Sequence, residues 1–176
     1  MNGGNRSTSF GLRSLGSGFA AGLLATVPMT ILMVVSHRFL KIQERYPLPP
    51  RIIMSRLLGG RWDIAATVDK VDATELSVLT IISHFSYGGA CGSLLAIAGR
   101  FVPMPGVVKG IVFGLGVWAA SYLAWLPALG ILPPATEAPP RRNAVMIAAH
   151  IVWGAAAGLL LDLFEPGDAT GDTGAL

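Results

Sequence analysis

The sequence predicts an all-α, multi-pass membrane protein with four transmembrane helices. Hydrophobic residues make up 52% of the 176 residues and charged residues make up 13%, about half of the roughly 25% that a soluble domain carries. Four windows contain no charged residue: 14–36, 76–98, 110–136 and 143–161. Each window is about as long as the ~20 residues that a helix needs to cross the ~30 Å hydrocarbon layer of a bilayer. What remains is too short for a separate soluble catalytic domain.

The four spans are expected at about residues 15–36, 75–98, 109–130 and 143–162, within one domain over 14–164. The first span contains Pro28, which removes one helical hydrogen bond. We expect the flanking hydroxyls of Thr26 and Thr30 to bond the carbonyls that the proline leaves free. The tail 1–13 is rich in Gly and Ser, and the tail 165–176 is acidic. Both tails are expected to be disordered.

The longest connection covers residues 37–75. It contains Pro47-Leu-Pro-Pro50, which cannot continue a helix. Residues 51–58 then place Ile53 and Met54 on one face and arginines on the other, which is typical of a short helix lying in the membrane interface. A solvated loop is the alternative. Basic residues are more frequent on this side than on the side of the two tails. The positive-inside rule therefore places the 37–75 loop in the cytoplasm of a protein of the cell inner membrane.

A nine-residue pattern, His-x-x-aromatic-Gly-x-x-x-Gly, occurs in the second span and again in the fourth, from His84 to Gly92 and from His150 to Gly158. The first and third spans each carry a pair of glycines four residues apart. Spans two apart in the chain have the same orientation in the membrane. The repeat therefore predicts two parallel helical hairpins related by a pseudo-two-fold axis along the membrane normal. The glycines expected at helix contacts are Gly18, Gly22, Gly88, Gly92, Gly110, Gly114, Gly154 and Gly158.

Each repeated histidine shares one stripe of its helix with the two glycines that follow it, because a turn has 3.6 residues. Tyr87 and Trp153 flank these stripes. Glycines of this kind let helix backbones approach closely, so we expect His84 and His150 to point into helix contacts rather than at lipid. Three roles stay open: a structural hydrogen bond to a neighbouring helix, a proton or solute path, and ligation of a haem iron or a metal by both imidazoles. The candidate polar site comprises His84, His150, Tyr87, Trp153, Thr26 and Thr30.

Short motifs of the spans resemble one known group of proteins. The segment Ala21-Gly22-Leu-Leu-Ala-Thr26-Val-Pro-Met29-Thr30 resembles the first helix of the YagU-like small inner-membrane proteins. The two His-x-x-aromatic-Gly-x-x-x-Gly helices are similar to recurring helices of the same group, so the resemblance covers all four spans. It implies a four-helix integral membrane protein of unknown function, and it carries no catalytic residue over to this chain.

The sequence lacks the motifs of common enzymes: Gly-x-Ser-x-Gly, a phosphate-binding loop, His-Glu-x-x-His and Cys-x-x-Cys. The net charge of +3 comes from loops beside the membrane and does not indicate nucleic-acid binding. We therefore expect a non-enzymatic component of the lipid bilayer without a cofactor. It would be a packing or assembly partner, or a small oligomeric pore whose subunit contacts use the glycine stripes. The alternatives are a haem or metal protein that uses His84 and His150, and a transporter of protons or small solutes.

Overall fold

The computed structural model describes residues 4–39, 49–57 and 73–165. Regular structure within these ranges is helical throughout, and four segments have the length and composition of membrane spans: Leu12–Ser36, Ser77–Phe101, Gly106–Ala128 and Pro140–Phe164. The predicted all-α fold with four spans is confirmed. In chain order, the elements are α1 (Gly4–Phe39), α2 (Pro49–Leu57), α4 (Ala73–Ala98), the 3₁₀ turn η2 (Gly99–Phe101), α5 (Gly106–Ala119), the π-helical turn η3 (Ala120–Trp125), α6 (Leu126–Ala128), the 3₁₀ turn η4 (Ala135–Glu137) and α7 (Pro140–Phe164).

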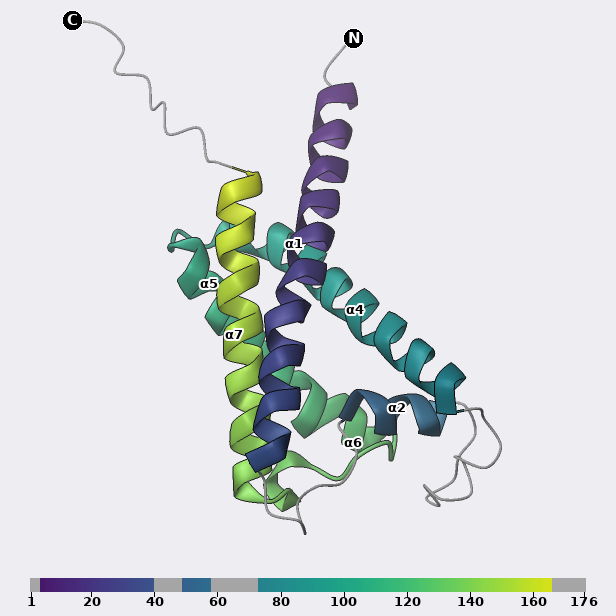
Figure 1. The fold of residues 1–176 in the computed structure, drawn as a ribbon. Helices are drawn as coiled ribbons and strands as arrows, with labels where there is room; N and C mark the ends of the chain where they lie inside the picture. Colours follow the sequence, from purple (N-terminus) through teal and green to yellow (C-terminus); the bar gives the residue numbers. More distant parts are fainter. Residues whose placement is uncertain (1–3, 40–48, 58–72, 166–176) are drawn as a thin grey trace, which may run out of the picture.

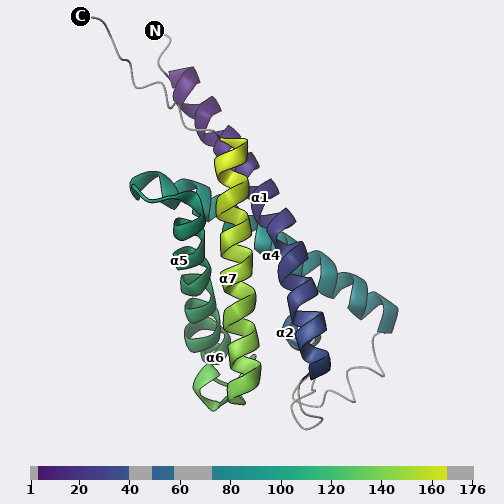
Figure 2. The ribbon, with the colours of Figure 1, turned by 60° about the vertical axis from the view of Figure 1, so that its left-hand side comes forward.

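The spans pack as two hairpins, α1 with α4 and α5 with α7 (Figure 1, Figure 2). The contact between α1 and α7 joins the hairpins. A perfect two-fold axis would pair this contact with an equal one between α5 and α4, but α4 meets α5 only slightly. The two halves therefore share their internal pairing, while the contacts between them are unequal.

The first helix is longer than expected, because α1 begins at Gly4 and residues 4–13 continue the span where the sequence analysis expects a disordered tail. Extending an existing helix adds a hydrogen bond per residue without the cost of a new nucleus. The helix also runs through Pro28 without a break. The hydroxyl of Thr26 donates to the Gly22 carbonyl (2.8 Å) and that of Thr30 to the Thr26 carbonyl (2.7 Å). Pro28 leaves the carbonyl of residue 24 without its helical donor, and neither threonine bonds that carbonyl. The expectation that Thr26 and Thr30 bond the freed carbonyl is therefore wrong.

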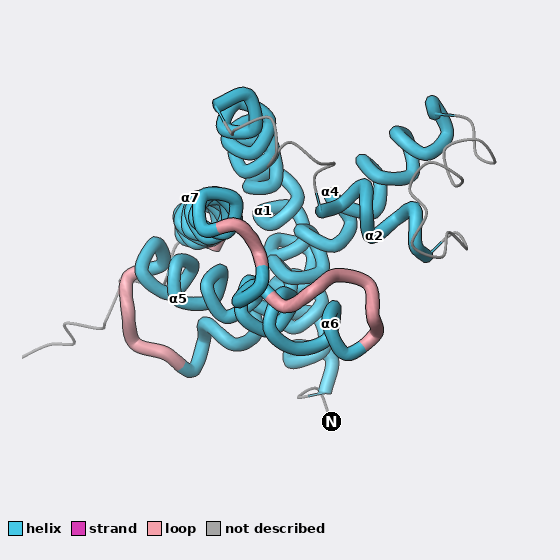
Figure 3. The backbone as a smooth tube through the Cα atoms, turned by 90° about the horizontal axis from the view of Figure 1, so that it is seen from below, coloured by secondary structure: helices cyan, strands magenta, loops and turns pink. Residues whose placement is uncertain are grey.

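The short helix α2 begins at Pro49, two residues earlier than expected. Proline is well tolerated in the first turn of a helix, since the N–H groups there have no helical partner. The helix packs against α4, as the end-on view shows (Figure 3), and it buries Pro49 and Ile52. It is thus a helix that packs on protein. Residues 40–48 and 58–72 of the connection, and the tail from 166 to 176, lie outside the described residues.

The third span is not one regular helix. A π-helical turn, η3, separates α5 from α6, and in it the Leu126 N–H donates to the carbonyl of Ser121, five residues earlier. Pro127 follows directly. In a regular α-helix the ring of this proline would meet the carbonyl of Leu123 and could not donate to it. The wider turn accommodates this conflict, and π turns inside helices are frequently found at functional sites.

Candidate functional site: a pocket between the two hairpins

The first hairpin is built around a crossing of glycines. Gly18 and Gly22 of α1 lie directly against Gly88 and Gly92 of α4. A Cβ atom added to Gly18 would lie 2.6 Å from the Gly92 carbonyl oxygen, and one added to Gly22 would lie 2.8 Å from the Gly92 Cα. Both distances are shorter than real Cβ contacts. Only glycine therefore permits this approach of the two backbones.

The second hairpin has an equivalent crossing. Gly110 and Gly114 of α5 lie against the α7 segment that carries His150, Gly154 and Gly158. A Cβ on Gly154 would lie 2.7 Å from the Gly110 carbonyl carbon. The crossing also includes Gly106, which the sequence analysis did not single out: a Cβ on Gly158 would lie 2.6 Å from its carbonyl carbon. All eight glycines expected at helix contacts thus lie inside the hairpins of one chain.

The glycine crossing of the first hairpin leaves α4 steeply inclined to α1, and the two helices diverge toward the N-terminal end of α4 (Figure 1). A pocket of about 220 Å³ lies on this side of the crossing. Its walls come from all four spans and from α2. The lining residues are Thr26, Met29 and Met33 of α1; Pro50, Ile53 and Met54 of α2; Ser83, His84, Tyr87, Gly88 and Cys91 of α4; Val117, Ser121, Tyr122, Trp125 and Leu126 of the third span; and His150 and Trp153 of α7.

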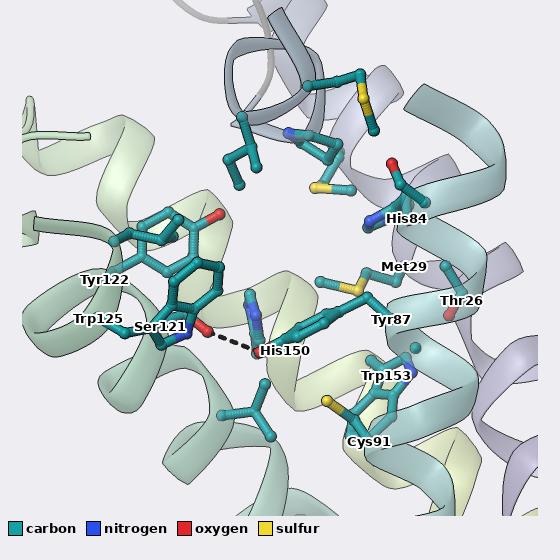
Figure 4. A pocket seen from close by; sticks show the side chains of 18 residues that line it. Thr26, Met29, His84, Tyr87, Cys91, Ser121, Tyr122, Trp125, His150 and Trp153 are labelled. Atoms are coloured by element: carbon teal, nitrogen blue, oxygen red, sulfur yellow. Dashed lines mark hydrogen bonds between the residues drawn. The ribbon is translucent and has the colours of Figure 1, made fainter. Parts of the chain in front are cut away.

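Both repeated histidines line this pocket (Figure 4). His150 is buried, and its Nδ1 lies 2.7 Å from the Met146 carbonyl oxygen, one turn earlier on its own helix. Since a carbonyl only accepts, Nδ1 must carry the proton. In the neutral imidazole the lone pair then lies on Nε2. The hydrogen bond is thus within α7, and not to a neighbouring helix as the structural interpretation supposed.

His84 is half-buried, and its Nε2 is buried without a hydrogen-bond partner among the described residues. The ring packs edge-on against Phe85, with centroids 6.1 Å apart. A buried polar atom that lacks a partner costs about 1–3 kcal/mol. Atoms of this kind call for a specific explanation, and a role in binding a ligand is one.

The aromatic residues of the two motifs each reach across to the other hairpin. The Trp153 indole N–H of α7 donates to the Gly22 carbonyl of α1 at 3.1 Å, and the Tyr87 hydroxyl of α4 lies 3.1 Å from the Ser121 hydroxyl of η3. The second bond spans the pocket (Figure 4). In both motifs the aromatic side chain thus bonds the other hairpin, although the packing between the hairpins is unequal. Trp153 bonds α1 in a tight helix contact, whereas Tyr87 bonds η3 across the pocket.

The π turn places Ser121, Tyr122 and Trp125 on the pocket wall. Tyr122 and Trp125 were not among the site residues expected from the sequence. The one available signal was Pro127, which implies an irregular helix just before it. Thr26 is fully buried and lines the pocket, whereas Thr30 does not belong to the lining.

The chemistry of the lining is mostly apolar and uncharged. It includes three methionines, a free cysteine and several aromatic rings, and no Asp, Glu, Lys or Arg among the described residues. Within the same part of the chain, no three residues of the types His, Cys, Asp and Glu are grouped so that they could hold a metal ion. The polar groups of the lining include the two imidazoles, the Tyr87–Ser121 hydroxyl pair, and the hydroxyls of Ser83 and Tyr122, which donate to the Thr80 carbonyl and to Met146 Sδ. This arrangement can hold an apolar body and one or two hydrogen-bonding groups.

Comparison with known proteins identifies a family but no individual relative. The family model described as a protein of unknown function (DUF1440) matches residues 19–159. This range contains both histidine motifs and seven of the eight glycines, all except Gly18. No curated protein and no solved structure matches the chain.

Proposed function

The chain belongs to the DUF1440 family, which is of unknown function, so we propose its role from its own pocket. We propose that it is a non-enzymatic membrane protein that binds a small, uncharged, mostly apolar molecule between its two hairpins. The observation that carries the proposal is the Nε2 atom of His84, a buried nitrogen that has no hydrogen-bond partner among the described residues and lies in a mostly apolar cavity.

The nature of the ligand follows from what the pocket lacks. A charged molecule would leave water for a lining without a counter-charge, which is costly. A pure hydrocarbon would leave Nε2 of His84 unsatisfied. A molecule with an apolar ring or chain and a single hydroxyl or carbonyl avoids both costs, and it could reach the pocket through the bilayer, where such molecules concentrate.

The other functions expected from the sequence receive less support. An oligomeric pore built on the glycine stripes would need those stripes free, whereas they are engaged within one chain. A packing or assembly role would use another surface. Ligation of haem or a metal by His84 and His150 stays a prediction, as does residence in the cell inner membrane with the 37–75 loop in the cytoplasm. Transport of a small solute would use the same pocket, and binding is its first step.

The proposal is tested with two probes that differ by one hydroxyl, naphthalene and 1-naphthol. Binding to the purified protein in detergent is followed by quenching of tryptophan fluorescence, since Trp125 and Trp153 line the pocket. A single hydrogen bond is worth about 1 kcal/mol, so 1-naphthol should bind about fivefold more tightly than naphthalene. Replacement of His84 by Leu should abolish this preference while naphthalene still binds.

A pair of variants on the third span supplies the control. Val117→Trp places a large side chain in the pocket and should abolish binding of both probes. Val112→Trp makes the same change at an exposed position of the same helix and should leave binding intact. If Val117→Trp and Val112→Trp bind the probes alike, or if the His84 variant keeps the preference for 1-naphthol, the probes do not bind in the pocket that we propose.

A further inference from the structure

A second cavity, of about 110 Å³, lies at the opposite end of the glycine crossings from the first pocket. It shares no lining residue with that pocket. Its walls are the C-terminal ends of α4 and α7 and the first turns of α5. Two cations and two carboxylates line it together with small and apolar residues. The charged residues are Arg100, Lys109, Asp162 and Glu165.

The level of this cavity in the membrane follows from the spans. The second span ends at Phe101, the third begins at Gly106 and the fourth ends at Phe164. The cavity thus lies where three spans end, at the boundary between the hydrocarbon layer and the headgroups. Charged side chains at such helix ends are in reach of lipid headgroups.

The two carboxylates are held in place by uncharged donors. Asp162 accepts a hydrogen bond from the backbone N–H of Gly106 at 3.1 Å, and Gly106 is the first residue of α5. Glu165 accepts one from the hydroxyl of Ser17 in α1. Each carboxylate is thus oriented from a neighbouring helix and keeps acceptor capacity toward the cavity, because a carboxylate can accept about four hydrogen bonds.

The two cations are oriented in the same manner. The Lys109 ammonium donates to the Gly99 carbonyl at 3.2 Å, and it makes no ion pair within the described part of the chain. An ammonium has three donors, so two remain. Arg100 donates to the hydroxyl of Ser14, a buried residue of α1. The cavity therefore presents donors of positive charge and acceptors of negative charge within a volume that fits one small polar group.

We propose that this cavity binds the headgroup of a zwitterionic phospholipid, one that carries a phosphate and a primary ammonium. The phosphate would pair with Lys109 and Arg100, and the ammonium with Asp162 and Glu165. Leu95 and Leu161 form the apolar part of the lining, beside which the acyl chains would begin. A lipid whose headgroup is only anionic would bring no cation to pair with Asp162 and Glu165, so the mixed charge of the cavity favours the zwitterion.

The test uses the full chain purified in detergent and native mass spectrometry with three lipids of identical acyl chains: a phosphatidylethanolamine, a phosphatidylcholine and a phosphatidylglycerol. The phosphatidylethanolamine should be retained about tenfold more than the phosphatidylglycerol, which corresponds to about 1.4 kcal/mol. The phosphatidylcholine should be retained less, since its quaternary ammonium donates no hydrogen bond. Soluble phosphoethanolamine tests the other source of the same chemistry. If it binds as tightly as the lipid, the ligand is a free phosphomonoester and the proposal of a lipid is overturned.

Two variants that each remove one charge, with matched controls, separate the role of the cations from that of the carboxylates. Lys109→Gln should weaken retention of all three lipids, whereas Arg141→Gln, at the exposed start of α7, should not. Glu165→Gln should bring phosphatidylethanolamine to the level of phosphatidylglycerol, whereas Glu137→Gln, exposed in η4, should keep the preference. Should Lys109→Gln not fold, the Glu165 comparison decides alone. Equal retention of the three lipids by the unaltered protein, or a Glu165 variant that keeps the preference, would show that the charges are merely solvated.

Discussion

Replacement of Gly154 by Ala tests the backbone contact between α5 and α7. The added Cβ would meet the Gly110 carbonyl oxygen, and it would lie 2.7 Å from the Gly110 carbonyl carbon and 3.1 Å from the Ile111 Cα. All three atoms belong to the backbone of α5 and cannot rotate away. Because ordinary contacts at a Cβ begin at 3.4 Å, α5 and α7 must part or shift along each other.

The cost is obtained by comparison with Gly116, another glycine of α5, at which an added Cβ meets nothing within 4 Å. Alanine gains about 1 kcal/mol over glycine in a helix interior, and this gain applies at both positions. The difference between the variants therefore isolates the overpacking, which typically costs about 1–3 kcal/mol. We expect Gly116→Ala to equal or exceed the original stability and Gly154→Ala to fall below it.

The assay is reversible unfolding in mixed micelles of increasing SDS fraction, followed by far-UV circular dichroism. Gly88→Ala provides an intermediate case, because its Cβ would chiefly meet the Thr26 Oγ1, which can rotate to another position. The expected order of stability is Gly116→Ala, then Gly88→Ala, then Gly154→Ala. If the Gly154 and Gly116 variants unfold at the same SDS fraction, the backbone contact between α5 and α7 is not what the structure indicates.

Three further predictions concern the links between the hairpins and the pocket wall. Trp153→Phe should lower the free energy of unfolding by about 1 kcal/mol more than Trp118→Phe, whose buried N–H has no partner among the described residues. Tyr87→Phe and Ser121→Ala should each destabilise by about 0.5–1.5 kcal/mol, and a double-mutant cycle should show that the two effects do not add. Pro127→Ala should allow a regular helix and move Ser121, so the preference for 1-naphthol should decrease while the circular dichroism spectrum shows no loss of helix.

The helices and the glycine contacts could be anticipated because they depend on short-range regularities. A charge-free window of about 20 residues has few folds open to it in a bilayer. The four-residue spacing of Gly88 and Gly92 fixes one helix face whatever the neighbours are. The partner of that face, Gly18 with Gly22, was suggested by the repeat, since only small residues allow a second backbone to come equally close.

The pocket could not be anticipated, because it depends on how far α4 diverges from α1 after the crossing. Nothing in the pattern of α4 encodes that angle. The same limit applies to α2, whose sequence suits a membrane interface as well as the protein surface on which it packs. The hydrogen bond of His150 to the Met146 carbonyl could not be predicted either. An imidazole can bond its own helix or a neighbouring one, and the positions of histidines in the sequence do not distinguish the two.

The crossing of α1 and α4 has a mechanical consequence. Glycines meet there backbone to backbone, with Phe19 packed against Gly89 and Thr26 against Gly88. His84 lies eight residues from Gly92, which is about 12 Å along the helix axis. A rotation of about 10° at the crossing would therefore carry the imidazole through about 2 Å, roughly the thickness added by one methyl group. The width of the cavity therefore depends on the angle at which α4 crosses α1, and that angle is set at a contact of glycine backbones about two turns away from the imidazole.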